Sequence, residues 1–169
     1  MILFDDTSEM YKVKTDWYFA RANQKKTAEF SITSERGVWN LCLAQQFDDA
    51  ASFMDPVMRK AVEGFSDQLF RGLAELVKRI VALCQTHEKS AKRDFVKACQ
   101  QLDQDTYPQS LCFQVFDRTR EGADPFELVS EWALRQSGTA KGMEVLRAAL
   151  GGDIRFTEKL ARNDGEELE

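Results

Sequence analysis

The stretch "DPVMRKAVEGFSDQLFRGLAELVKRIVALCQTH", residues 55–87, decides the fold of this chain. Asp55 and Pro56 form a strong helix start, because a side-chain acceptor precedes a proline at the first helical position. Apolar residues then recur at steps of three and four as far as Cys84, a pattern typical of one face of an amphipathic helix. The stretch predicts one long helix ending near His87, with Gly64 and Gly72 as the places where a kink is expected.

Shorter helical segments follow and precede this one. Their expected first residues are polar capping residues or prolines, namely Ser34, Ser90, Pro108, Asp124 and Thr139. Residues 2–14 differ, because "ILF" and "MYKV" read as short strands joined by the turn formers "DDTSE". Such a hairpin is too small to be stable alone in water. The sequence predicts a mainly α protein, with a small N-terminal β-hairpin followed by a bundle of six to seven helices.

Composition narrows the functional classes. A length of 169 residues suits one compact domain, or one domain with a small appendage. The net charge of -5 argues against wholesale coating of nucleic acid but leaves a local basic site open. The chain has no run of 18 apolar residues and no secretory signal pattern, so we expect a cytoplasmic protein without a membrane span.

The cysteines and the single histidine predict no metal site. Cys42, Cys84, Cys99 and Cys112 form no C-x-x-C pair and have apolar neighbours, which is typical of buried thiols in a reducing compartment. His87 lies near the end of the long predicted helix, where a structural or solvent-exposed position explains it.

The stretch "KVKTDWYF", residues 12–19, is the clearest functional signal. Side chains on a strand alternate between faces, so Lys12 and Lys14 project from the same side. Ammonium groups are compact charges suited to phosphate oxygens. A bare K-x-K on a short strand is more often a solvated face. The Thr-Asp-Trp-Tyr-Phe that follows makes this stretch far more specific than K-x-K alone.

The whole string resembles the last nucleotidyltransferase motif of ATP-dependent RNA ligases of the phage RNA-ligase-1 type. In that family a K-x-K strand leads through a Ser/Thr-Asp-Trp-Tyr turn into a helix. The resemblance implies that Lys12 and Lys14 contact the phosphates of ATP, with magnesium as the metal of the complete enzyme. It also implies that residues 1–27 end a nucleotidyltransferase domain and that residues 28–157 form an all-helical RNA-specificity domain. Residues 158–169 are rich in acidic residues, and we expect them to form a tail.

The chain departs from the family in one respect that matters for catalysis. These ligases form lysyl-AMP through a lysine in a K-x-D/N-G motif, and no lysine of this chain stands in such a tetrapeptide. The family's Glu-Gly motif would fall just before Met1. We therefore expect either a C-terminal portion of a ligase or the small half of a split ligase whose catalytic portion is a separate chain. Alone, this chain is not expected to adenylylate, and no catalytic residue is assigned to it.

The expected partner is RNA, a tRNA or a stem-loop. Candidate RNA-binding cations follow the K-x-K stretch and lie in the basic segment "KSAKRDFVK"; they are Arg21, Lys25, Lys26, Lys89, Lys92, Arg93 and Lys97. A solvated polar face explains the second group equally well. The alternative hypothesis for the whole chain is a non-catalytic helical module that binds protein or RNA, in which the K-x-K hairpin is coincidental.

Overall fold

The computed structural model describes residues 2–4, 10–12, 34–52 and 54–156, and this part of the chain is mainly helical, as the sequence predicts. The helices, in chain order, are α2 (Glu35–Leu43), α3 (Phe47–Ala51), α4 (Pro56–Thr86), α5 (Lys92–Gln100), α6 (Gln109–Thr119), α7 (Pro125–Ser137) and α8 (Ala140–Ala149). Strands β1 (Ile2–Phe4) and β2 (Met10–Lys12) pair antiparallel, with Ile2 opposite Lys12. The predicted domain boundaries at residues 27/28 and 157/158 lie outside the described residues.

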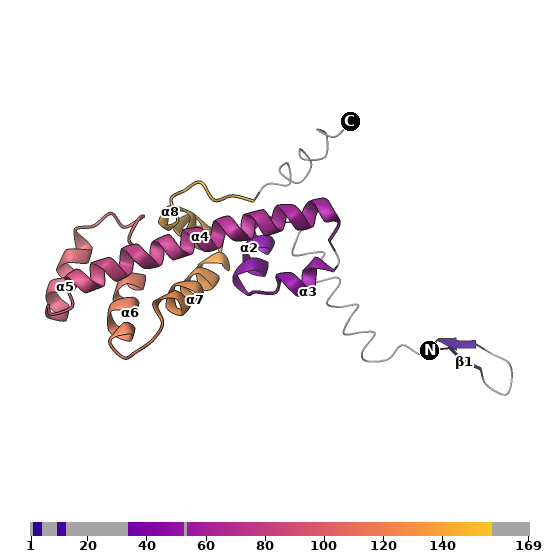
Figure 1. The fold of residues 1–169 in the computed structure, drawn as a ribbon, viewed down its shortest axis with the longest axis horizontal. Coiled ribbons are helices and arrows are strands. Elements are labelled where there is room, and N and C mark those ends of the chain that lie inside the picture. Colours follow the sequence, from indigo (N-terminus) through magenta and orange to yellow (C-terminus); the bar gives the residue numbers. More distant parts are fainter. Residues whose placement is uncertain (1, 5–9, 13–33, 53, 157–169) are drawn as a thin grey trace.

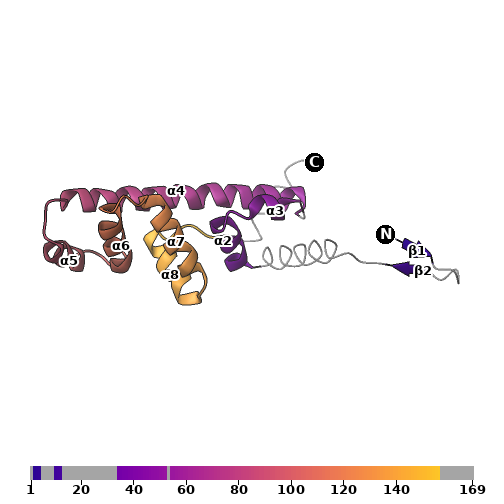
Figure 2. The ribbon, with the colours of Figure 1, turned by 90° about the horizontal axis from the view of Figure 1, so that it is seen from below.

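Helix α4 is the longest of the described helices. Its 31 residues span about 46 Å at 1.5 Å per residue, and in Figure 2 the other helices all lie on one side of it. Asp55 caps it by accepting a hydrogen bond from the Met58 N–H at 2.8 Å, and Pro56 occupies the first turn, both as predicted. The helix is continuous through Gly64 and Gly72, the two positions where a kink was expected. It ends at Thr86 with His87 as its C-cap, in agreement with the predicted end near His87.

Gly72 serves packing rather than bending. A Cβ at this position would lie 2.7 Å from Ile154 Cδ1, so the chain that follows α8 crosses α4 at close range here. That segment can turn back because Gly151 and Gly152 adopt positive φ values of 100° and 85°, which side-chain-bearing residues rarely adopt. The predicted end of the last helix at this glycine pair is confirmed.

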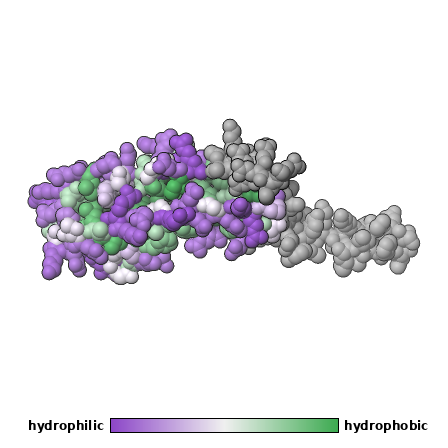
Figure 3. All heavy atoms as spheres, turned by 45° about the horizontal axis from the view of Figure 1, so that its top comes forward, coloured by the Kyte–Doolittle hydropathy of each residue, from purple (hydrophilic) through white to green (hydrophobic). Residues whose placement is uncertain are grey.

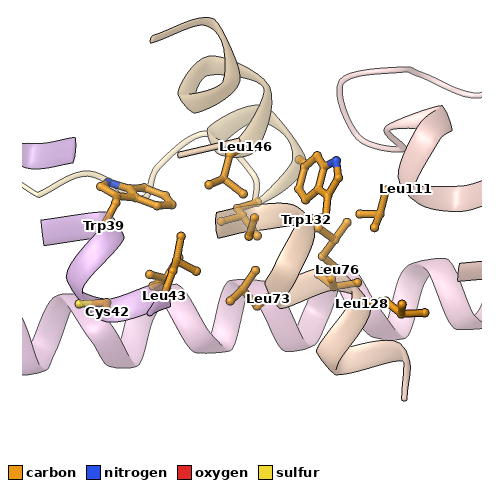
Figure 4. Close-up of a cluster of buried hydrophobic side chains, with 14 of the residues drawn as sticks. Trp39, Cys42, Leu43, Leu73, Leu76, Leu111, Leu128, Trp132 and Leu146 are labelled. Carbon is orange, nitrogen blue, oxygen red and sulfur yellow. The ribbon is translucent and has the colours of Figure 1, made fainter. Parts of the chain in front are cut away.

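One continuous core joins these helices. Helix α7 packs against α2, α4, α6 and α8 and so lies at the centre of the arrangement (Figure 1). Figure 4 shows Trp39 of α2 and Trp132 of α7 on either side of Leu146, above Leu73 and Leu76 of α4. All five side chains are buried, as their helical spacing predicts.

Two local expectations are wrong. Helix α5 begins after Ala91, which makes no side-chain capping bond, so Ser90 is not its cap. The helical spacing also places Val57 and Leu134 on apolar faces, yet they are 44% and 40% exposed. Periodicity identifies an apolar face but does not say whether another element covers all of it.

The outer surface is largely polar. The face drawn in Figure 3 is hydrophilic over most of its area, with hydrophobic residues in patches between charged ones. On α4, neighbouring charges pair along the exposed side, as Arg59 does with Glu63 at 3.0 Å and Lys78 with Glu75 at 2.6 Å. Within the described ranges, no helix has both the length and the apolar character that crossing a membrane requires.

Candidate nucleic-acid interface

Of the two predicted phosphate-binding lysines, the structure describes only the backbone of Lys12. Lys12 ends strand β2, and its backbone pairs with Ile2. Its side chain, and the whole of Lys14, Arg21, Lys25 and Lys26, lie outside the described residues. The role of these residues in holding ATP phosphates or RNA stays a prediction.

Helix α5 carries the second predicted group of cations at one end of α4 (Figure 1). Phe95 fixes the helix, because its ring stacks on Phe116 of α6 with centroids 3.9 Å apart and planes 9° from parallel. The Phe95 side chain is fully buried, and Cys99 on the same side of the helix is 1% exposed. Arg93 and Lys97 lie about half a helical turn away from Phe95 in angle and are exposed.

Arg93 and Lys97 share one outward face. They are four residues apart, which brings their side chains to neighbouring positions on the helix surface. Lys89, in the turn between α4 and α5, is exposed as well. Two or three cations on one face can contact successive phosphates of a nucleic-acid backbone. The structure therefore places Arg93 and Lys97 side by side on α5 and leaves Lys89 exposed in the preceding turn.

Lys92 is the exception. Its ammonium group forms an ion pair with Asp117 of α6. Both side chains are partly exposed, so the pair adds little stability, but it offsets the positive charge of Lys92. Lys92 thus tethers α5 to α6 and contributes less than its neighbours to attraction of phosphate.

Arg120, the C-cap residue of α6, is a further cation that no sequence pattern singled out. Its guanidinium lies 3.8 Å from the centroid of the Phe116 ring, and its Nη2 donates a hydrogen bond to the Glu88 carbonyl at 2.6 Å. This places it beside Lys89, on the same end of the molecule. The signal that could have found it is a basic residue at the expected end of α6, where a cation favours the helix dipole.

A groove of about 260 Å³ lies between the last turns of α4 and α6, and Arg120, Glu88 and Cys84 line it. Burial raises the pKa of Cys84 to about 11, with the neighbouring Cys99 adding to the shift. Burial likewise raises the pKa of Cys112 to about 12. These thiols stay protonated at neutral pH, which makes them poor nucleophiles and poor metal ligands.

The cysteines and His87, the other side chains considered for chemistry, are packed within the fold. The four cysteines are free thiols; Cys42, Cys99 and Cys112 are buried, as predicted, whereas Cys84 is half-buried. His87 is half-buried and packs edge-on against Phe95, with centroids 5.8 Å apart. Among the described residues, no three His, Cys, Asp or Glu side chains come together in a way that could hold a metal ion.

Comparison of the chain with protein-family models, with curated proteins and with solved structures gives no match.

Proposed function

We propose that this chain is the C-terminal part of an ATP-dependent RNA ligase of the phage RNA-ligase-1 type. The observation that carries the proposal is the eight-residue stretch "KVKTDWYF", residues 12–19, with its K-x-K spacing and its Trp-Tyr pair. By this resemblance, the complete enzyme joins a 5′-phosphate to a 3′-hydroxyl in RNA in the cytoplasm. The hairpin would end its nucleotidyltransferase sheet, and the helical bundle would be its RNA-specificity domain.

Lys12 and Lys14 have an electrostatic role in this proposal. Bound ATP supplies the AMP group that the complete enzyme transfers, and negative charge develops on the departing pyrophosphate. Two fixed ammonium groups on one strand face stabilise that charge. The described residues offer no cluster for magnesium, so we derive no step through the ion from this chain.

The exposed cations of the α4–α5 end are the RNA-binding surface of the proposal. Lys89, Arg93, Lys97 and Arg120 would act together with the candidate RNA-binding cations Arg21, Lys25 and Lys26. The net charge of -5 makes such a surface local, so RNA is held over one region rather than along the whole molecule.

Salt-dependent binding of a stem-loop RNA tests this surface. In Arg93→Ala/Lys97→Ala we expect weaker binding and a plot of log affinity against log salt that is shallower by about 1.4–1.8. That change follows from the loss of about 0.7–0.9 in slope for each phosphate contact. Lys92→Ala should change the slope less than Arg93→Ala alone or Lys97→Ala alone, because Asp117 already offsets the charge of Lys92.

Arg59→Ala/Lys78→Ala is the matched control, since it removes the same number of cations from the exposed side of α4. The control should bind RNA with the slope of the wild type. Equal slopes for the wild type, the α5 double variant and this control would remove α5 from the RNA site.

The nucleotide chemistry has a separate test. Incubation of the isolated chain with ATP and magnesium should leave its lysines free of AMP, as intact mass spectrometry can measure. The reason is that no lysine here stands in a K-x-D/N-G motif. A lysyl-AMP adduct on this chain would contradict the assignment of the nucleophile to another part of the enzyme.

A non-catalytic helical interaction module is the second candidate function. The observation in its favour is that the described helices between Val38 and Phe156 form one continuous buried core. This hypothesis expects Lys12→Ala to leave every nucleotide-dependent property unchanged. The ligase hypothesis expects the same variant to weaken triphosphate binding.

A further inference from the structure

Two aromatic rings and a guanidinium form a stack at the end of α6. The Phe116 ring has Phe95 at a centroid distance of 3.9 Å, and the guanidinium carbon of Arg120 lies 3.8 Å from the same centroid. Two groups this close to one ring centre cannot share a face, so they cover opposite faces of Phe116. Both rings are buried and Arg120 is exposed, so the stack runs outward and ends on Arg120.

Arg120 is also fixed from a second direction. Its Nη2 donates a hydrogen bond to the Glu88 carbonyl at 2.6 Å, which holds the guanidinium between the end of α6 and the turn that follows α4. A guanidinium is planar, and nucleobases stack on its faces as they do on aromatic rings. One face of Arg120 is covered by Phe116, and Arg120 lines the groove at the end of α4. The other face is therefore available to a flat ring that enters the groove.

The groove, of about 260 Å³, has the mixed lining that a nucleobase requires. Val81, Val115 and Pro125 contribute apolar surface, and Gln85 and Glu88 contribute hydrogen-bonding side chains. A nucleobase has the matching character, with apolar faces and with donors and acceptors along its edges. The exposed Gln85 amide both donates and accepts, and the exposed Glu88 carboxylate accepts from base N–H groups.

The charges at the groove favour a base that belongs to RNA. Every base of an RNA strand is attached to a backbone with phosphates on both sides, so a base site needs cations close to it. Arg120 supplies one, and the exposed Lys89 follows Glu88 directly in the chain. An apolar side chain of a peptide would use the walls of the groove but neither these cations nor the guanidinium plane.

We propose that this groove binds one unpaired nucleobase of RNA, stacked on the outer face of Arg120 with its edge toward Gln85 and Glu88. The inference rests on the proposed RNA-binding function and adds a requirement for single-stranded nucleotides. A base inside a duplex has both faces covered by its neighbours, so it offers no face to Arg120. The helical domain thus recognises an unpaired nucleotide, such as one in a loop, in addition to the phosphate backbone.

Two single strands of equal charge test the proposal. Oligocytidylate and an abasic ribose-phosphate oligomer of the same length carry the same phosphates, but only oligocytidylate has bases. Cytosine also has an amino group that can donate to the Glu88 carboxylate. Fluorescence anisotropy should show that the chain binds oligocytidylate about tenfold more tightly than the abasic strand, the ratio expected for stacking of one base.

The two ways of failing are distinct. Measurable and equal affinity for both strands would overturn the base site and leave the basic surface as a binder of phosphate alone. Absence of binding to either strand would contradict the proposed RNA-binding function, and the base site with it.

Arg120→Lys separates stacking from charge. Lysine keeps the positive charge but has no planar group, so the variant should bind oligocytidylate about fivefold or more weakly and bind the abasic strand as the wild type does. Arg118→Lys is the matched control, because Arg118 lies in the last turn of α6 and pairs instead with Glu121 at 3.4 Å. Circular dichroism confirms that both variants are folded. Equal affinity of Arg120→Lys and Arg118→Lys for oligocytidylate would overturn the proposal.

A free nucleotide is the other source of a stacked base. Cytidine monophosphate should bind at least about tenfold more weakly than oligocytidylate, because it offers Lys89 and its neighbours no adjoining phosphates. Competition of the monophosphate against labelled oligocytidylate measures this ratio. A monophosphate that binds as tightly as the oligomer would assign the groove to a free nucleotide and overturn the proposal.

Discussion

Two regions of the helical bundle are held together by different interactions. Where α2 meets α7 and α8, polar contacts between distant parts of the chain accompany the buried core: Arg147 binds Glu35, and the Ser137 hydroxyl donates to Asn40 Oδ1. Where α5 meets α6, Phe95 stacks on Phe116 and Lys92 pairs with Asp117, while Arg93 and Lys97 are exposed. The first region therefore has polar contacts beside a buried tryptophan, whereas the second leaves cations exposed at the surface.

The first region should be the more sensitive to a single substitution. Trp39 of α2 is fully buried and packs edge-on against Phe65, with centroids 5.3 Å apart. In Trp39→Ala we expect the free energy of unfolding to fall by about 3–5 kcal/mol, because the change leaves a large cavity. Urea denaturation followed by circular dichroism measures it; a loss below about 1 kcal/mol would mean that α2 is not part of the core.

High pH should weaken the same region through Cys42. Burial raises the pKa of this thiol from 9.0 to about 11. A raised pKa in the folded state contributes stability below pH 9, and this contribution is lost as pH rises toward 11 because the unfolded thiol ionises first. Between these pH values the wild type should lose about 1–3 kcal/mol more than Cys42→Ala. Denaturation curves at several pH values test this, and parallel losses in the two proteins would contradict it.

The Glu35 contacts should have a smaller effect. In Glu35→Gln we expect a loss of about 1 kcal/mol, because the carboxylate is about one-third exposed and water partly screens its pairing with Arg147. The control is Glu63→Gln, which removes the exposed partner of Arg59 and should change stability by less than about 0.5 kcal/mol. If Glu35→Gln matches this control, the polar contacts do not distinguish the two regions.

The second region should tolerate loss of its outward cations. Arg93→Ala/Lys97→Ala should change the free energy of unfolding by less than about 0.5 kcal/mol, since both side chains are exposed and alanine favours helix. Thermal or urea denaturation checks it. A large loss of stability would show that these cations support the fold. Weaker RNA binding by the variant would then reflect unfolding rather than the loss of phosphate contacts.

The sequence could predict the features of the fold that depend on neighbouring residues, namely the helix caps and helix ends. Asp55, Asp124 and Thr139 cap helices as expected, and α4 ends where its pattern ends, because caps and periodicity depend on near neighbours in the chain. The contact of Lys92 with Asp117 joins residues 25 positions apart. Its position, like that of Arg120 on Phe116, depends on how α5 and α6 pack, which no local pattern encodes.

The two candidate sites also differ in how much of each the sequence could predict. The basic character of α5 follows from its composition, but only the packing of Phe95 shows that Arg93 and Lys97 face outward together. The proposed ATP-phosphate site depends instead on the letters of "KVKTDWYF", and the Lys14 position lies outside the described residues. Chemistry alone must therefore test that site.

Footprinting of amines tests the central claim most directly. The isolated chain is labelled with a limiting amount of an acetylating reagent at rising millimolar ATP, and the extent of labelling at each lysine is measured by mass spectrometry. The account predicts that ATP protects Lys12 and Lys14, that adenosine does not, and that labelling of exposed Lys78 is unchanged. Equal labelling of Lys12, Lys14 and Lys78 at every ATP concentration would contradict it.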